Sequence, residues 1–118
     1  MVRKQCEQAV TVNVKMRGGD GEIRLESLLS AEELYDKGRL FSRVVVAPGC
    51  SIGYHTHENE MEAYIIINGN GEYDDDGTRV RVEAGDVTLT RSGQGHGVVN
   101  DSGADLIMLA LILHKDRG

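Results

Sequence analysis

The sequence has few of the features that mark membrane, secreted or disulfide-rich proteins. Two cysteines among 118 residues do not make a disulfide framework, so we expect Cys6 and Cys50 to be free thiols. The longest uninterrupted apolar run, residues 106–113, is far shorter than the roughly 20 residues that span a bilayer. The N-terminus is basic, but polar residues follow where a signal peptide needs an apolar segment. We therefore expect a cytoplasmic protein with no membrane partner.

Positive charge is also scarce. Lys and Arg total 13 residues against 19 Asp and Glu residues, which gives a formal net charge of −6 at pH 7. Nucleic-acid binding depends on a basic surface that neutralises phosphates. The acidic balance therefore argues against DNA or RNA as a partner.

Proline occurs once, at Pro48, whereas glycine occurs 15 times and separates many short apolar segments. Alternating or β-branched patterns predict strands at residues 10–14, 22–26, 40–47, 61–67, 79–83, 87–90, 97–100 and 106–113. One helix of two turns is expected over residues 31–37, because Ser30 and Glu33 form a capping box and Gly38 suits its end. The sequence thus predicts a single all-β domain over residues 1–118, a sandwich or barrel with one short helix.

Two short motifs point to chemistry that their surroundings do not support. Residues 49–53 match the G-x-S-x-G motif of serine hydrolases, but no helical pattern follows Ser51 and the chain is too short for that fold. The acidic segment from Glu72 to Glu83 approximates a calcium-binding EF-hand loop, but strands are predicted on both sides in place of helices. We expect an acidic hairpin that turns at Asp76 and Gly77, where only loose cation binding stays open.

Three of the four histidines fall in an arrangement suited to a metal ion. His55 and His57 are two residues apart, so an extended strand presents both on one face. Glu62 follows after a turn, and barrel closure would bring His96 alongside. Three imidazoles and one carboxylate suit a divalent first-row metal and leave two octahedral positions open. The alternative is that the histidine pair is merely exposed beside a turn.

The spacing of these residues resembles the two sequence motifs of the cupin family. The first motif, over residues 49–69, is reproduced without a gap by Gly49, His55, His57, Glu62 and Gly69. The second motif, over residues 85–100, is reproduced by Gly85, Ser92, Gly93, His96 and Asn100. One position departs, because Arg91 stands where the family usually has proline. That change concerns the shape of the loop and not the ligand set.

The resemblance implies a six- to eight-stranded jelly-roll barrel, or double-stranded β-helix, with one metal ion inside. Its ligands would be His55, His57, Glu62 and His96. The resemblance also implies a hairpin end closed by Asn100 and turns at Gly49, Gly69, Gly85 and Gly93, which tolerate positive φ. This ligand set accepts manganese, iron, cobalt, nickel, copper or zinc.

The charge of such a site indicates the kind of ligand that it would bind. A divalent ion with three neutral imidazoles and one carboxylate has a formal charge of +1, which favours a small anionic molecule, and oxalate is the simplest candidate. The resemblance implies a metal-dependent enzyme acting on a small organic acid, with dioxygenase, decarboxylase or isomerase chemistry. The alternative is a non-catalytic module that binds or senses a small ligand, or holds a structural metal. A metal-free cupin is a third alternative, which the intact ligand set opposes.

The candidates for a second catalytic or substrate-binding group are less distinctive. Tyr54 and Tyr64 flank the ligands and could either hydrogen-bond a substrate or pack. Glu60 could act as an acid or base, or lie exposed like most charged residues. Arg91 could steer an anion or form a surface salt bridge, and His114 is expected at the surface near the chain end. Because imidazoles must be neutral to bind metal, we expect metal affinity to fall below about pH 6.

The predicted strands at residues 61–67 and 106–113 are apolar on both faces. A barrel strand with one face in water should alternate with polar residues. A second sheet or a partner subunit should therefore cover the outer face. We predict a homodimer, for which the exchange of edge strands is a common route.

Overall fold

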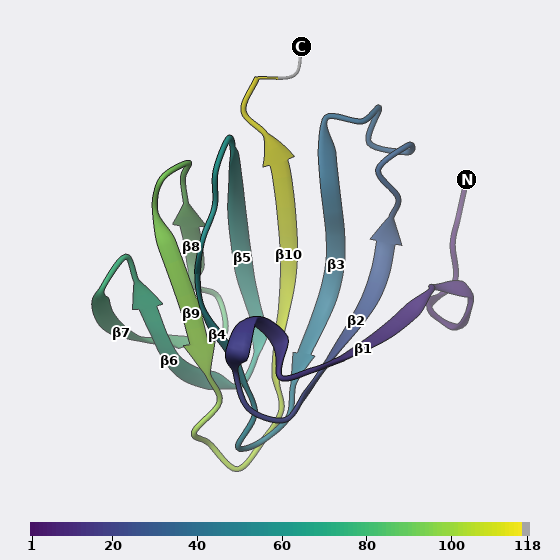
Figure 1. Cartoon of the computed structure of the whole chain (residues 1–118). Helices are drawn as coiled ribbons and strands as arrows, with labels where there is room; N and C mark the ends of the chain where they lie inside the picture. The colour runs from purple at the N-terminus through teal and green to yellow at the C-terminus, as the bar shows by residue number, and fades with distance from the viewer. Residues whose placement is uncertain (117–118) are drawn as a thin grey trace.

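The computed structural model describes residues 1–116, and antiparallel strands make up most of it (Figure 1). In this range the elements are, in chain order, η1 (Gln5–Glu7), β1 (Val10–Val14), η2 (Met16–Gly18), β2 (Glu22–Leu29), β3 (Gly38–Val46), β4 (Ser51–Thr56), β5 (Glu60–Asn68), β6 (Asn70–Asp75), β7 (Thr78–Glu83), β8 (Val87–Thr90), β9 (Gly95–Val99) and β10 (Leu106–His114). The all-β prediction is confirmed.

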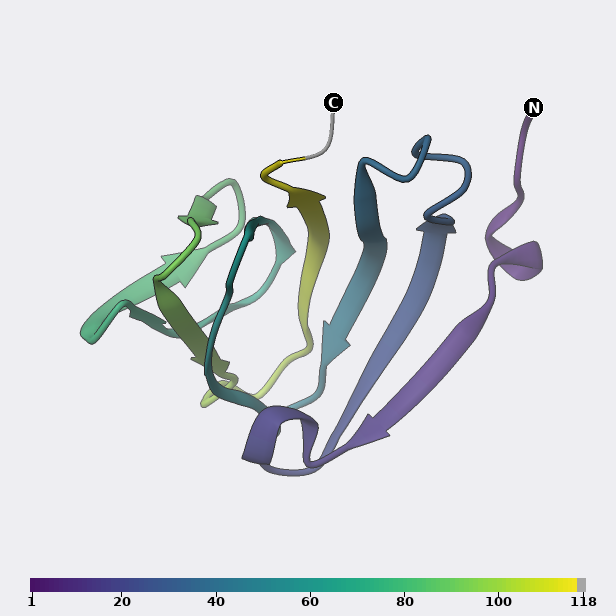
Figure 2. The ribbon, with the colours of Figure 1, turned by 45° about the horizontal axis from the view of Figure 1, so that its top comes forward.

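The strands form two facing sheets, the arrangement of a jelly roll. The larger sheet has the order β1-β2-β3-β10-β5-β8, and the smaller sheet has the order β4-β9-β6-β7. β10 lies between β3 and β5, so the end of the chain completes the middle of the larger sheet. Figure 2 shows the smaller sheet opposite the β5 and β10 side of the larger one, while β1 and β2 extend beyond it.

The core lies between the two sheets and follows the period-two alternation of their strands. On β10 the inward residues Leu106, Met108, Ala110 and Ile112 are at most 3% exposed. The smaller sheet contributes Ile52, Tyr73, Val82 and Val98 from the opposite side. An apolar interior therefore surrounds any polar group that points inward.

Eight of the strands match the predicted set to within three residues at their ends. The other two in residues 1–116, β4 and β6, were outside that set. Their sequences carry few aliphatic residues, because inward positions hold histidine on β4 and tyrosine on β6. A strand that contributes polar groups to the interior thus lacks the apolar alternation by which strands are recognised.

The predicted helix at residues 31–37 is wrong. Residues 31–36 form consecutive turns, in which Tyr35 and Asp36 both have a φ of 55°. The capping box is present, since the Ser30 amide donates to Glu33 at 2.9 Å and the Glu33 amide donates to the Ser30 hydroxyl at 3.2 Å. Two left-handed residues stop the helix after its first turn, and Gly38 begins β3 instead of ending a helix.

No helical segment between residues 1 and 116 has the length and apolar character that a membrane crossing requires.

The fold also accounts for the two competing motifs. Ser51 begins β4, is buried, and accepts a hydrogen bond from the Asp20 amide at 2.8 Å, so a strand stands where a hydrolase needs a helix. The acidic segment forms the β6–β7 hairpin, in which Asp76 and Gly77 have φ values of 50° and 98°. Positive φ at both positions is what a type I′ turn requires. The hairpin interpretation is confirmed.

Asn100 closes the end of β9 as predicted. Its side chain is fully buried, and its amide group donates to the carbonyls of Val46 and Ala104, both at 2.8 Å. Its carbonyl oxygen accepts from the Ser102 amide at 3.0 Å. One side chain thus ties the loop after β9 to the larger sheet. The predicted turn glycines all have positive φ, namely Gly49, Gly69, Gly85 and Gly93.

Replacing Asn100 should destabilise the fold well beyond the effect of an exposed asparagine. Asn100→Ala leaves buried carbonyls without donors, at a cost of about 1–3 kcal/mol in the free energy of unfolding. Asn70→Ala, at an exposed position on β6, should change it by less than about 0.5 kcal/mol. Urea denaturation of the three proteins measures the difference. Equal stability of the two variants would contradict the role of Asn100.

Candidate metal centre

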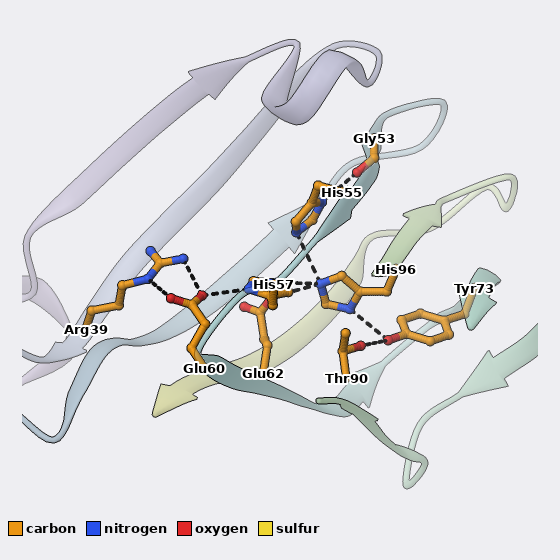
Figure 3. A network of polar contacts seen from close by, with 9 residues as sticks. All are labelled: Arg39, Gly53, His55, His57, Glu60, Glu62, Tyr73, Thr90 and His96. Atoms are coloured by element: carbon orange, nitrogen blue, oxygen red, sulfur yellow. Dashed lines mark hydrogen bonds and ion pairs between the residues drawn. The ribbon is translucent and has the colours of Figure 1, made fainter. Parts of the chain in front are cut away.

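Four side chains that the sequence analysis named as candidate metal ligands meet inside the barrel, between the two sheets. In the part of the chain that the structure describes, His55, His57, Glu62 and His96 form a group in which one ligand atom of each lies within 4.8 Å of the others. The pairing of β4 with β9 sets His55 opposite His96, and Glu62 reaches the group from β5 of the other sheet (Figure 3). Closure of the two sheets therefore assembles the group.

His57 lies just beyond β4, and the β8–β9 loop holds its backbone. The His57 amide donates to the Gln94 carbonyl at 3.0 Å, and the Gly93 amide donates to the His57 carbonyl at 2.7 Å. The Arg91 amide, which a proline would lack, donates to the Gln94 side chain at 3.0 Å. The Gln94 amide donates back to the Arg91 carbonyl at 3.0 Å. Arg91 thus takes part in a closed turn, and this turn positions a histidine of the first motif.

The Nδ1 atoms of His55 and His57 face hydrogen-bond acceptors outside the group. His55 Nδ1 lies 2.7 Å from the Gly53 carbonyl oxygen, and His57 Nδ1 lies 2.6 Å from Glu60 Oε2. A carbonyl or carboxylate oxygen only accepts, so each of these Nδ1 atoms carries a proton. When these rings are neutral, as metal binding requires, Nε2 carries no proton and its lone pair faces the group.

His96 is the most deeply buried of the three imidazoles, and two tyrosines hold it. Its Nδ1 lies 2.8 Å from the Tyr73 hydroxyl, which is 3.0 Å from the Thr90 hydroxyl. The Tyr64 ring stacks on it, with centroids 5.0 Å apart and planes 17° from parallel. Burial raises the pKa of both tyrosines, so both hydroxyls are protonated at neutral pH. Tyr64 reaches the site by stacking on His96, and a hydrogen bond to Glu62 also contributes to its raised pKa. Sequence reasoning missed Tyr73, although alternation along β6 places it inward.

The distances inside the group fit a single first-row metal ion. His96 Nε2 lies 3.1 Å from His57 Nε2 and 3.2 Å from His55 Nε2. Glu62 Oε1 lies 3.0 Å from His57 Nε2 and 2.9 Å from His96 Nε2. Two ligand atoms that each lie about 2.1 Å from one metal ion are about 3.0 Å apart when their bonds to the ion form a right angle. Electron pairs this close together repel one another unless protons or a metal ion lie between them.

The electrostatics of the group also suit a cation. Burial opposes ionisation of Glu62, but hydrogen bonds from His57 and His96 outweigh it and lower the pKa of Glu62 to about 2. The same hydrogen bond, which His57 donates to Glu62, raises the pKa of His57, while burial lowers the pKa of His55. At neutral pH Glu62 is therefore a carboxylate, the form in which it binds metal.

Tyr54 does not join the group. It alternates with His55 along β4, so its side chain lies on the outer face of the smaller sheet and is 49% exposed. There it covers Gly95, where an added Cβ would lie 2.3 Å from the tyrosine hydroxyl oxygen. The structure gives Tyr54 a packing position on the outside of the barrel.

Arg91 and His114 also lie outside the group. The Arg91 side chain is exposed and lines a surface groove of about 360 Å³ with Glu60, Met61 and Lys115. His114 is the last residue of β10, opposite Glu60, and is half-buried there. Within residues 1–116, no hydrogen bond or ion pair links the side chain of either residue to a member of the ligand group.

Glu60 lies behind His57, on the side away from the other ligands. Its carboxylate accepts from Arg39 Nε at 2.9 Å and from Arg39 Nη2 at 2.7 Å, besides contacting His57. The hydrogen bond from Arg39 lowers the pKa of Glu60 to about 2. No local signal in the sequence marks Arg39, because it comes from β3, about 20 residues earlier in the chain.

Comparison with known proteins agrees with the fold. The sequence profile of the cupin domain matches residues 42–112, more than half of the chain. An oxalate-binding protein from Thermotoga maritima is 46% identical over 98 residues, which cover 83% of this chain and 81% of that protein. A crystal structure of a predicted oxalate decarboxylase from Thermotoga maritima superposes with a TM-score of 0.93 at 42% identity, covering 97% of this chain and 99% of the other. A cupin 2 conserved barrel domain protein from Salinispora arenicola superposes with a TM-score of 0.58 at 27% identity, covering 91% and 76%. With its two facing sheets and its ligand group at the positions of both motifs, this chain belongs to the cupin family.

Proposed function

We propose that the protein binds one divalent first-row metal ion and, through it, a small dicarboxylate of the oxalate type. The observation that carries the proposal is the convergence of the imidazole Nε2 atoms on Glu62, with every Nδ1 atom already held by a partner elsewhere. His55, His57, Glu62 and His96 would hold the ion. When bound, it would supply a Lewis acid with open positions for carboxylate oxygens.

The charge of the loaded site supports an anionic ligand. Three neutral imidazoles and one carboxylate leave a divalent ion with a formal charge of +1, in an interior where charges interact strongly. Two open positions suit a ligand that offers two oxygen atoms, as oxalate does. A relative with 46% identity is named an oxalate-binding protein, which supports the same class of ligand.

Binding without turnover is the function that the geometry favours. Decarboxylation of oxalate to formate and carbon dioxide needs a proton at carbon, so it needs an acid beside the ligand. Glu60 is ionised and held by Arg39 and His57, while the Tyr64 ring stacks on His96 and its hydroxyl hydrogen-bonds to Glu62. These two candidates are therefore already engaged. Decarboxylation is the second candidate function, favoured by the structural similarity to a predicted oxalate decarboxylase.

Metal-loaded protein is expected to bind oxalate, and metal-free protein is not. Oxalate should bind at least about tenfold more tightly than acetate, because its second oxygen binds at high effective concentration. Isothermal titration calorimetry with manganese- or zinc-loaded protein measures both affinities. Formate release measured on the same sample distinguishes binding from turnover.

Histidine variants identify the site of binding. His55→Ala and His96→Ala each remove one ligand and should abolish stoichiometric metal uptake and oxalate binding. His114→Ala removes a histidine outside the group and should leave both unchanged. Elemental analysis of the purified proteins reports the metal. Full metal content in His55→Ala and His96→Ala would rule out the proposed site.

Metal binding should release protons and weaken at acid pH. The hydrogen bond to Glu62 raises the pKa of His57 above its ordinary 6.5, so the metal must displace a proton from His57 near and below that pH. Affinity is expected to decline once the pH falls below the raised pKa of His57, by up to about tenfold per pH unit for each proton released. Calorimetry between pH 8 and 5.5, in buffers of different ionisation enthalpy, counts those protons. A constant affinity with no proton release would contradict this linkage.

We also infer that the protein is a homodimer joined through the outer face of the larger sheet. Outward residues of neighbouring strands form an apolar surface across β3, β10, β5 and β8, namely Val45, Ile107, Leu109, Leu111, Ala63, Ile65, Val87 and Leu89. Ile65 and Leu89 are 45% and 43% exposed. Apolar surface of this extent marks an interface, and a two-fold axis lets one such face cover itself. β1 pairs with β2 of its own chain, so the inference does not depend on strand exchange.

A charge on this face should separate the subunits. Ile65→Glu places a carboxylate at the centre of the apolar surface and should give a monomer by light scattering after gel filtration. Val80→Glu is a matched control, because Val80 is 44% exposed on the other sheet and should leave the dimer intact. Circular dichroism verifies that both variants fold. A monomeric wild-type protein at micromolar concentration would overturn the inference.

A further inference from the structure

We propose that Glu60, held in place by Arg39, is a positioning residue for metal binding: it fixes the His57 ring so that Nε2 faces the metal site. The inference rests on the proposed metal site and adds to it two residues that do not touch the metal. It concerns how one ligand is oriented before the ion arrives.

The contacts of Glu60 leave its carboxylate little freedom. Arg39 Nε donates to Oε1 at 2.9 Å and Arg39 Nη2 donates to Oε2 at 2.7 Å, a two-point contact between planar groups. Glu60 Oε2 then accepts from His57 Nδ1 at 2.6 Å. The side chain of Glu60 is 13% exposed and that of His57 is 2% exposed. Figure 3 shows the three groups in a row that ends at the ligand group.

Two strands of the larger sheet anchor this row. Arg39 lies on β3 and Glu60 begins β5, and both strands pair with β10 between them. The guanidinium–carboxylate contact therefore links the two strands on either side of β10, from Arg39 at a register shift of β3 to Glu60, which pairs with His114. The carboxylate is in turn fixed relative to the sheet that supplies the ligand Glu62.

His57 depends on such support more than the other two histidines. His55 and His96 lie within β4 and β9, where strand pairing orients them. His57 follows the end of β4, so only loop contacts hold its backbone. A ring at this position could turn about its Cβ–Cγ bond and present a carbon in place of Nε2. The carboxylate opposes this turn, because it would exchange the Nδ1–H that donates to Glu60 for a C–H group.

The geometry assigns Glu60 to positioning instead of proton transfer. Oε1 contacts Arg39, and Oε2 contacts both Arg39 and His57. Both oxygen atoms are thus engaged on the far side of His57 from the metal site. A substrate bound at the open positions would meet the His57 ring before it met Glu60.

Metal affinity of a variant series tests the proposal, with zinc as the probe and a chelator as competitor. Glu60→Ala should weaken zinc binding by about 10- to 100-fold, the range seen when an outer partner of a metal ligand is lost. Glu60→Gln keeps an acceptor for Nδ1–H and should retain most of the affinity. Arg39→Met should weaken binding less than Glu60→Ala does. In the Glu60→Ala background, Arg39→Met should have no further effect, because Arg39 acts only through Glu60.

Glu58→Ala is the matched control for charge. Glu58 is an exposed acid two residues from Glu60, and its removal changes the net charge by the same amount. It should bind zinc like the wild type. Equal losses in Glu58→Ala and Glu60→Ala would show that simple attraction of the cation explains the effect, and would overturn the proposal.

The exchange rate of the His57 Nδ1 proton is a measurement that a purely structural role of Glu60 would not change. In zinc-loaded wild-type protein with labelled histidine, nuclear magnetic resonance should show His57 protonated at Nδ1 and bound through Nε2. In Glu60→Ala that proton should exchange faster with water, while the signals of His55 and His96 stay in place. If wild-type protein binds no zinc, the proposed metal site fails. If wild type and Glu60→Ala bind zinc equally, only the positioning role fails.

Discussion

The candidate metal centre depends on one type of interaction, the hydrogen bond at the Nδ1 atom of each of its three histidines. A carbonyl of β4, the carboxylate of Glu60 and the hydroxyl of Tyr73 occupy these three atoms. Each contact turns its ring so that Nε2 points inward. Without them the same histidines could rotate or change tautomer, and the donor atoms would no longer converge on Glu62.

The two sheets contribute different residues to this site. The smaller sheet supplies His55 and His96, the segment after β4 supplies His57, and β5 of the larger sheet supplies Glu62 and Glu60. The β8–β9 loop closes against the His57 backbone and connects the two motifs physically. Arg91 fits into this loop because its amide donates to Gln94, so the missing proline does not open the turn. Ligands that are far apart in sequence thus share one rigid frame.

The two faces of the larger sheet serve different purposes. Its inner face carries the apolar core and the ligand Glu62, whereas its outer face presents aliphatic residues from four neighbouring strands. These residues explain why two strands are apolar on both sides, which a monomeric barrel would not require. The metal site and the proposed dimer interface therefore lie on opposite faces of one sheet, and each can be altered without direct contact with the other.

The sequence alone was enough to identify the fold class, most of the strands and the ligand group. Strand alternation and turn glycines are local properties, and the spacing of the histidines and Glu62 survives in the linear order. Local rules failed at residues 31–37, where a complete capping box did not lead to a helix because Tyr35 and Asp36 adopt left-handed conformations. They also missed β4 and β6, whose inward side chains are polar.

Tertiary structure decided which neighbours of the ligands take part in the site. Tyr54 adjoins His55 in sequence but faces outward, whereas Tyr73 and Arg39 are distant in sequence and contact the site or its support. The direction of a side chain follows from strand parity, but its partners follow from which strands the two sheets bring together. A contact such as Arg39 with Glu60 exists only after β10 has joined β3 to β5, so no local pattern records it.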